Sequence, residues 1–233
     1  MAGGDIRHIF FNYAQTMPKP KPLPLEPDHD CPLCPRLAAF RQTHRLLSPD
    51  WFGGPVPTFG PRNARLLIVG LAPGLKGAHR TGRPFTGDYA GELLYQTLLK
   101  FGFAQGEYKA RPDDGLILTD CLIANSVRCV PPENKPTPQE IATCRPFLLS
   151  VLETMPQLTH VVALGRIAHE SFLRTRGLPL KSHPFAHGAV HQLDGLSLYD
   201  SYHCSRYNTQ TGVLTQAMFE QVFTTIRKAL DKG

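Results

Sequence analysis

Four of the six cysteines have the spacing of metal ligands. Cys31 and Cys34 are joined by two residues in Cys31-Pro32-Leu33-Cys34, and Cys129 and Cys144 form a second pair further along the chain. Four thiolates suit either a tetrahedral zinc ion or a [4Fe-4S] cluster, and unconnected free thiols are the alternative. The spacing does not choose between zinc and iron. A bound group would be structural and would tie the N-terminal segment to the middle of the chain, because four cysteine ligands leave no open position for a substrate.

A second group of residues could recognise a planar heterocycle. Glycines in Gly70-Leu71-Ala72-Pro73-Gly74 let backbone amides approach a ligand closely, and Phe85 offers an aromatic face for stacking. The amide of Asn125 can both donate and accept, as the edge of a base requires. Each residue also has an ordinary interpretation: Phe85 as core, Asn125 as a strand end, and His203 as a half-buried imidazole. A common site is favoured because all of them follow strands of one predicted sheet.

Apolar runs and helix caps indicate the elements that position these residues. Buried strands are predicted at residues 66–70, at 116–118 continuing through 122–124, at 161–164 and at 196–199. Helices are predicted from Asp88 to Gly102, from the capping box Thr137-Pro138-Gln139-Glu140, over residues 166–174, and from Thr215. The alternation predicts an α/β fold, a three-layer α/β/α sandwich around a central, mostly parallel four-stranded sheet.

Proline usage divides the chain. Half of its 22 prolines fall within the first 61 residues, which predicts a segment that wraps around the core without a regular helix or central strand. We therefore expect a single domain over residues 1–233, with a proline-rich N-terminal segment at 1–64 and the α/β core at 65–233.

Composition narrows the class of protein. The 233 residues are 42% hydrophobic, enough for a core, and no apolar run approaches the roughly 20 residues needed to cross a bilayer. We expect a soluble, cytoplasmic protein that does not bind membranes. The net charge of +6 fits an anionic partner such as nucleic acid, or ordinary solvation.

A phosphate-binding glycine fingerprint is missing, which disfavours a nucleotide cofactor. Cys121 and Cys204 have no partner at ligand spacing, so we interpret them as small buried hydrophobic residues.

Four motifs in order resemble those of family 5, or type B, uracil-DNA glycosylases. They are Gly70-Leu71-Ala72-Pro73-Gly74, Thr81-Gly82-Arg83-Pro84-Phe85-Thr86-Gly87-Asp88, Asn125-Ser126-Val127-Arg128-Cys129-Val130-Pro131-Pro132 and His203-Cys204-Ser205-Arg206-Tyr207-Asn208-Thr209-Gln210-Thr211-Gly212. The resemblance implies a monomeric DNA repair enzyme that hydrolyses the N-glycosidic bond of uracil, and of deaminated bases such as hypoxanthine or xanthine, in double-stranded DNA. It also implies a [4Fe-4S] cluster on Cys31, Cys34, Cys129 and Cys144, which pins the N-terminal wrap.

The resemblance assigns roles to single residues. Catalytic roles fall to His203, Asn125 and Asp88. Phe85 would stack on the flipped base, Asn125 would read its edge, and His203 would hydrogen-bond the oxygen on which charge grows. The backbone of Gly70, Leu71 and Ala72 would help to hold the base. DNA contacts are expected from Arg80, Arg83, Arg128, Ser205, Arg206, Tyr207 and Asn208.

The group that activates water is left open. Other uracil glycosylases carry an acidic or amide side chain in the first motif, where this chain has the apolar Leu71 and Ala72. Either water attacks an already dissociated sugar with little base assistance, or Asp88 or His79 supplies the base. We favour stabilisation of the leaving base as the main effect, because Asp88 also has the position of a helix cap.

Two other functions remain open on the sequence alone. One is a lesion-binding protein with an iron-sulfur cluster or zinc and no chemistry. The other is a glycosylase of the same superfamily that prefers purines. Excision assays with different bases would separate them, since a binder releases no base and a purine specialist leaves uracil largely untouched.

Overall fold

A computed structural model describes residues 26–232 of the chain. Its helices are α1 (Pro35–Leu47), α2 (Ala78–Thr81), α3 (Tyr89–Lys100), α4 (Pro138–Glu153), α5 (Arg166–Thr175), α6 (Arg206–Gln210) and α7 (Gln216–Leu230). Its strands are β1 (Leu66–Gly70), β2 (Ala104–Gln105), β3 (Ile117–Leu118), β4 (Cys121–Asn125), β5 (His160–Leu164), β6 (Val190–Leu193) and β7 (Leu196–Ser201). None of these helices is long and apolar enough to span a bilayer.

The central sheet has five strands in the order β4-β1-β5-β7-β6. The pairs β4-β1, β1-β5 and β5-β7 are parallel, and β6 joins the edge antiparallel to β7. The mostly parallel α/β sheet is confirmed, but the prediction of four strands is wrong. The fifth, β6, was missed because none of its residues is fully buried, so it carries no apolar run.

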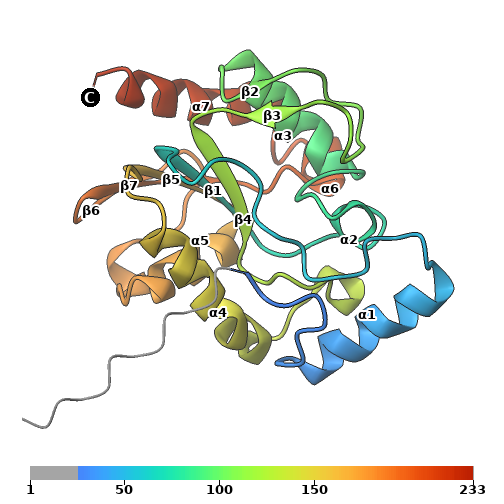
Figure 1. Cartoon of the computed structure of the whole chain (residues 1–233). Coiled ribbons are helices and arrows are strands. Elements are labelled where there is room, and N and C mark those ends of the chain that lie inside the picture. Colours follow the sequence, from blue (N-terminus) through green and yellow to red (C-terminus); the bar gives the residue numbers. More distant parts are fainter. Residues whose placement is uncertain (1–25, 233) are drawn as a thin grey trace, which may run out of the picture.

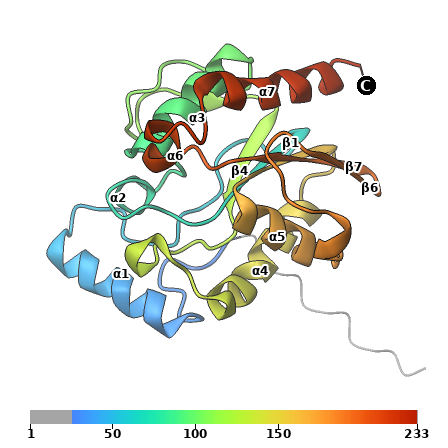
Figure 2. The same cartoon turned by 180° about the vertical axis from the view of Figure 1, so that it is seen from behind.

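Helices cover both faces of the sheet, with α3 and α7 on one side and α4 and α5 on the other (Figures 1 and 2). Along β1, Leu66 and Ile68 belong to the hydrophobic core under α3 and α7, whereas Leu67 and Val69 belong to the core under α4 and α5. This alternation follows from the two-residue period of a strand. Because both faces are covered, β1 and β4 are buried at every position.

The predicted run from residue 116 through 124 is not one strand. β3 pairs antiparallel with β2, and the chain then turns at Asp120, whose φ is 54°. The Asp120 carboxylate accepts hydrogen bonds from the backbone N–H of Arg65 (2.9 Å) and from its guanidinium (2.6 Å). This pairing fixes the point at which β4 enters the sheet beside β1.

The prediction that residues 1–64 lack a regular helix is wrong, because α1 lies among them. Pro35 occupies the start of α1, where a missing N–H costs nothing, and the next proline is Pro49, beyond the helix end. The wrapping itself is present among the described residues: Phe59 and Ile123 exchange backbone hydrogen bonds of 3.0 and 2.8 Å on β4. The first 25 residues lie outside the described part.

Three of the predicted helix starts are confirmed by side-chain caps, and the fourth, at Arg166, is present as the start of α5 without one. Asp88 accepts from the Gly91 N–H at the start of α3, and Thr215 accepts from the Met218 N–H at the start of α7. At α4, Thr137 and Glu140 form the reciprocal capping box. The loops at residues 73–87 and 201–212 contain the short helices α2 and α6, and Pro132–Asn134 forms a 3-10 turn.

Gly91 allows α3 to approach the turn that carries Phe85. A Cβ at this position would overlap with the Phe85 carbonyl oxygen and with the hydroxyl of Tyr108. Phe85 itself has a φ of 53°, a conformation that a bulky residue adopts only when its surroundings enforce it.

We therefore expect Gly91→Ala to lower the free energy of unfolding by about 1–3 kcal/mol through overpacking. The loss outweighs the roughly 1 kcal/mol by which Ala is the better helix former. Urea unfolding measures the effect, with Glu92→Ala as the control at an exposed neighbouring position, expected within about 0.5 kcal/mol of wild type. Wild-type or higher stability of Gly91→Ala would contradict this packing.

Candidate active site

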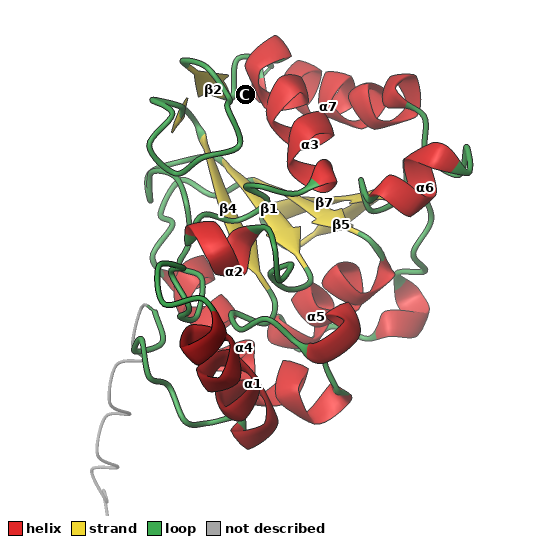
Figure 3. Ribbon diagram, turned by 90° about the vertical axis from the view of Figure 1, so that its right-hand side faces the viewer, coloured by secondary structure: helices red, strands yellow, loops and turns green. Residues whose placement is uncertain are grey.

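A pocket of about 620 Å³ is lined by residues that follow β1, β4 and β7 and by residues of α2, α3 and α6. Figure 3 shows where these elements lie in the fold. It is lined by Leu71, Ala72, Pro73, Gly74, Leu75, Lys76, Gly77, Ala78, Phe85, Asp88, Tyr89, Ala90, Asn125, Asn134, His203, Ser205 and Arg206. Ligands of open α/β sheets bind at this edge. The structure therefore brings together the residues that the sequence predicted for base binding and catalysis, although they come from three separate strand ends.

Gly70 lies beside Asn125 in the β1-β4 register, and the ring of Phe85 packs against Gly70. A Cβ on Gly70 would overlap with Asn125 Oδ1 and would come within 2.7 Å of Phe85 Cζ. Glycine is thus required here by close approach of side chains. Asn125 Oδ1 is buried and accepts no hydrogen bond from any described residue. Since a buried unpaired acceptor costs about 1–3 kcal/mol, this oxygen fits an N–H donor supplied by a ligand.

The Phe85 turn is held from beneath by buried polar groups. The Tyr95 hydroxyl donates to the Pro84 carbonyl, and the Tyr108 hydroxyl donates to the Phe85 carbonyl at 3.3 Å. The Phe85 ring lies 6.0 Å from the His203 ring, with 30° between the planes. Phe85 and His203 therefore form adjoining parts of the pocket wall.

Arg83 does not contact DNA as predicted, because it is buried in the core of this same loop. Its guanidinium makes a bidentate pair with Asp114 at 2.8 and 2.7 Å. The Phe59 and Tyr95 rings lie 5.2 and 5.4 Å from its Cζ. Burial alone would raise the pKa of Asp114, but hydrogen bonds from Arg83 and from two backbone N–H groups hold it well below its usual range. Arg83 supports the Phe85 loop.

Arg128 is the second arginine whose predicted DNA contact is wrong. Its side chain is 1% exposed and pairs with Glu26 at 2.7 Å. It also donates to the Val56 carbonyl at 3.3 Å. Arg128 thus anchors the N-terminal wrap to the end of β4, and no phosphate could reach it without unfolding that contact.

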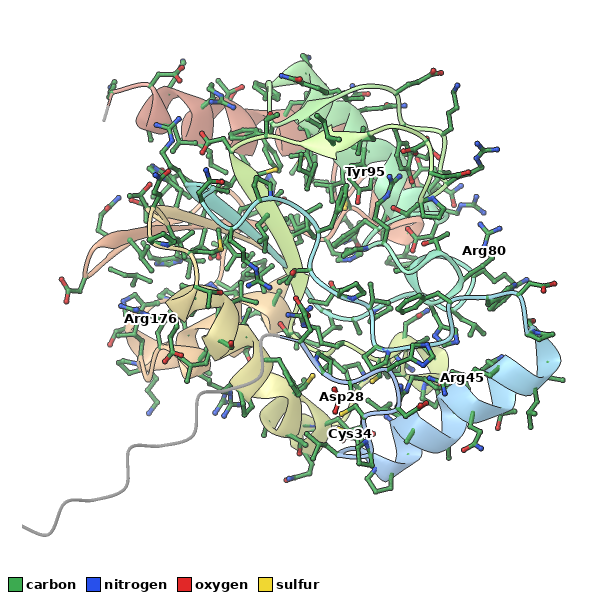
Figure 4. All side chains as sticks on the ribbon, viewed as in Figure 1. Asp28, Cys34, Arg45, Arg80, Tyr95 and Arg176 are labelled. Carbon is green, nitrogen blue, oxygen red and sulfur yellow. The ribbon has the colours of Figure 1, made fainter. Side chains whose placement is uncertain are left out.

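The other predicted DNA contacts lie at the surface or at the pocket mouth. Arg80 is exposed on the outer side of α2 (Figure 4), and Tyr207 on α6 is 72% exposed. The Arg206 guanidinium lies 5.3 Å from the ring of Tyr89. Ser205 caps α6 by accepting from the Asn208 N–H, and the Asn208 amide donates to the His203 carbonyl at 2.8 Å. Contact of these residues with DNA stays a prediction.

His203 is half-buried in the pocket wall. Desolvation lowers its pKa to about 4. The imidazole is therefore neutral at neutral pH and offers one N–H donor to the pocket.

Asp88 serves both as a helix cap and as a part of the pocket. Its Oδ1 accepts from the Gly91 N–H at 3.3 Å. Its Oδ2 lies so close to Gly77 that a Cβ there would overlap with it, and a Cβ on Gly74 would lie 2.9 Å away. Burial raises the pKa of Asp88 above its ordinary value, partly offset by the backbone hydrogen bonds. The predicted cap is confirmed, and one oxygen remains on the pocket side.

His79 cannot supply the base, because it lies outside the pocket lining. Its ring is fully buried and lies 6.3 Å from both the His44 and the Trp51 rings. Desolvation lowers its pKa to about 4. Of the two side chains proposed for activating water, only Asp88 reaches the site.

Asn134 and Tyr89 also line the pocket, although neither is among the predicted site residues. Asn134 comes from the proline-rich loop after Cys129 and has a φ of 58°, next to Glu133 at 54°. Two consecutive left-handed residues are unusual, and Asn tolerates this conformation best. The prolines around Asn134 indicate a turn in the sequence, but they do not indicate that the turn faces the pocket.

The four predicted ligand cysteines converge between α1 and α4. Cys31, Cys34, Cys129 and Cys144 line one small buried pocket, and Cys34 stands at the start of α1 (Figure 4). Burial and the neighbouring thiols raise the pKa of Cys34 to about 11. The chemistry of this donor set fits either a [4Fe-4S] cluster or zinc.

The two remaining cysteines behave as the sequence predicted. Cys121 and Cys204 are fully buried in the core under α3 and α7. The Cys121 thiol donates to the Phe103 carbonyl at 3.3 Å. Burial raises the pKa of Cys204 to about 12, so both act as small buried hydrophobic residues.

Comparison with known proteins shows the family of this chain. The family model described as the uracil DNA glycosylase superfamily matches residues 57–227. A type-5 uracil-DNA glycosylase of Thermus thermophilus is 45% identical over 198 residues, which is 82% of this chain and 90% of that protein. A type-5 uracil-DNA glycosylase of Pyrobaculum aerophilum is 38% identical over 208 residues, which is 88% of this chain and 90% of that protein. A type-4 uracil-DNA glycosylase of Archaeoglobus fulgidus is 30% identical over 141 residues, 60% and 62% of the two chains. The resemblance in the motifs is thus confirmed: the chain belongs to the uracil-DNA glycosylase superfamily, among its type-5 members.

Proposed function

We propose that this protein excises uracil from double-stranded DNA by hydrolysing the N-glycosidic bond, leaving an abasic site. The observation that carries this proposal is the unpaired Oδ1 of Asn125 beside Gly70 and Phe85. A planar base that enters the pocket places an N–H against this oxygen while its face meets the aromatic ring. A base inside a duplex cannot reach such a position, so the enzyme must flip it out of the stack.

His203 stabilises the leaving base in this proposal. As the glycosidic bond breaks, negative charge grows on the uracil oxygens, and the N–H of a neutral imidazole can donate to one of them. Because the pKa of His203 is low, its imidazole is already neutral before the base binds. No proton has to be released and no counterion has to be displaced from it.

Asp88 is the candidate for orienting water, because its second oxygen lies on the pocket side. A sugar that has already developed positive charge needs little base assistance, so we assign Asp88 the smaller effect. The nearby Leu71 and Ala72 provide no polar side chain for this task.

We extend the proposal to deaminated purines such as hypoxanthine and xanthine. A pocket of about 620 Å³ has room for a base larger than uracil. Two alternatives are a lesion-binding protein without chemistry and an enzyme that prefers purines. Single-turnover cleavage of duplexes with one uracil, hypoxanthine or xanthine tests all three, with alkali to break the abasic product. Excision of uracil supports the proposal; tight binding without release of any base would overturn it.

We also propose that Cys31, Cys34, Cys129 and Cys144 hold a [4Fe-4S] cluster that pins the N-terminal wrap. When bound, such a cluster stabilises the fold and takes no part in the reaction. Leu37, Val127 and Phe147 surround the thiols with apolar side chains, which keeps solvent away.

For the cluster, we expect iron and acid-labile sulfide in equal amounts in the purified protein. Cys34→Ser should lose bound iron and lower the melting temperature, because coordination contributes folding free energy. Cys121→Ala is the control and should retain the iron, since Cys121 lies in the core under α3 and α7, away from the four ligand cysteines. Stoichiometric zinc in place of iron would contradict the assignment.

For catalysis, we expect His203→Ala to slow single-turnover excision of uracil by about 10²–10³, the loss typical of one oxyanion donor. Asp88→Asn should cost less, and it keeps the cap of α3 because Asn caps a helix as well as Asp. Near wild-type excision by His203→Ala would remove His203 from the mechanism, and a larger loss in Asp88→Asn would make the carboxylate the main group.

The pH dependence follows from the lowered pKa of His203. Its neutral form is present above about pH 4, so kcat/KM should show no histidine step near pH 6.5. The profile is measured with subsaturating uracil-containing duplex, because kcat/KM reports the free enzyme. A step near pH 6.5 in wild type that disappears in His203→Gln would contradict this assignment.

A further inference from the structure

A cluster of aromatic side chains covers the carboxyl ends of β5 and β7, next to the pocket. Tyr202 follows β7 and directly precedes His203. Its ring stacks on His187, with centroids 4.9 Å apart and 21° between the planes, and lies 6.2 Å from Phe185. The Cζ of Arg166, the first residue of α5, lies 5.3 Å from the Phe185 ring. We call Arg166, Phe185, His187 and Tyr202 the aromatic platform.

The aromatic platform lies at the surface. Tyr202 is 36% exposed, Arg166 is exposed, and Phe185 and His187 are half-buried. Aromatic rings and a guanidinium beside a nucleic-acid site are the groups on which unstacked bases stack. The predicted roles of the four motifs do not use any of these side chains.

A buried ionic network fixes the segment that carries Phe185 and His187. On β7, the fully buried Asp200 carboxylate meets His169 Nδ1 at 2.7 Å and His191 Nε2 at 3.0 Å. It also accepts from the Ala186 N–H at 3.3 Å. His169 Nε2 lies 2.9 Å from the His183 carbonyl oxygen.

Both ring nitrogens of His169 face oxygen acceptors, an arrangement that favours the doubly protonated ring. Burial lowers the pKa of His169, but the hydrogen bond and charge of Asp200 outweigh it and leave the pKa above its ordinary value. The carboxylate and the imidazoles thus satisfy one another. This network hydrogen-bonds residues 183–189 to β7 and α5, which fixes the position of Phe185 and His187 beside Tyr202.

We propose that the aromatic platform binds the nucleotide next to the flipped uracil on the same DNA strand. Flipping leaves the neighbouring base without a stacking partner on one face, and the ring of Tyr202 can replace that partner. Tyr202 directly precedes His203 of the pocket wall, so the aromatic platform begins one residue away from the site that the uracil would occupy. The Arg166 guanidinium adds attraction for the phosphate. This inference rests on the proposed function in one respect, that the uracil occupies the pocket.

The test measures binding without excision. The probes are oligonucleotides with one tetrahydrofuran abasic site, used both as single strands and as duplexes. In each probe, 2-aminopurine is the neighbour of the abasic site on either its 5′ or its 3′ side. Wild type should quench 2-aminopurine on one of the two sides, because stacking on an aromatic ring quenches its fluorescence. Tyr202→Ala should abolish this quenching and weaken binding about fivefold or more, and Tyr202→Phe should restore both. Phe185→Ala should act in the same direction, and Ile117→Ala, an exposed apolar residue of β3, is the matched control.

Three results would overturn the proposal. Tyr202→Ala could bind both forms like wild type and Ile117→Ala. Its effect could be confined to duplexes, which would assign the platform to the opposite strand. It could slow uracil excision with unchanged binding and quenching, which would make Tyr202 only a support for His203. Because the probe carries no base to excise, failure of the proposed glycosylase activity is detected separately, with the uracil duplex.

Discussion

The meeting of Gly70, Asn125 and Phe85 is the contact on which the rest of the site depends. Two parallel strands end side by side, and the missing Cβ of Gly70 lets the Asn125 amide and the Phe85 ring approach the same point. The amide keeps a buried oxygen without a protein partner, and the ring is held in a left-handed backbone conformation. Both features are costly for folding alone, and both are explained by a planar ligand that stacks and donates. The buried Arg83 pair, the Gly91 contact and the capping oxygen of Asp88 all serve to hold this geometry.

Much of this could be predicted from the sequence, because the signals were local. The apolar run at residues 66–70 predicted a strand buried on both faces, and the Thr137 capping box located the start of α4. The predicted strand ends could then be combined with a general rule, that parallel sheets bind ligands at their carboxyl ends. That rule predicts that Phe85, Asn125 and His203 lie in one site.

The predictions that were wrong fall into two groups: some features depend on distant partners, whereas others have a local signal that the broader patterns hide. Arg83 and Arg128 are residues of the type that contacts DNA phosphates. However, Arg83 pairs with Asp114 and Arg128 pairs with Glu26, and both carboxylates lie far away in the sequence. The high proline content of the N-terminal segment hides the helix α1. The residues between Pro35 and Pro49 contain no proline, and this gap is the local signal for the helix. The edge strand β6 had a usable signal in Asp194-Gly195, a two-residue hairpin turn between alternating residues.

The most direct test of the central contact is single-turnover excision of uracil by Gly70→Ala, compared with wild type on the same end-labelled duplex. The added methyl would occupy the space between Asn125 Oδ1 and Phe85 that the base must share. We predict loss of uracil excision in a variant that still folds and still binds a duplex with an abasic site. Wild-type excision by Gly70→Ala would contradict the account, because the base would then be recognised elsewhere in the pocket.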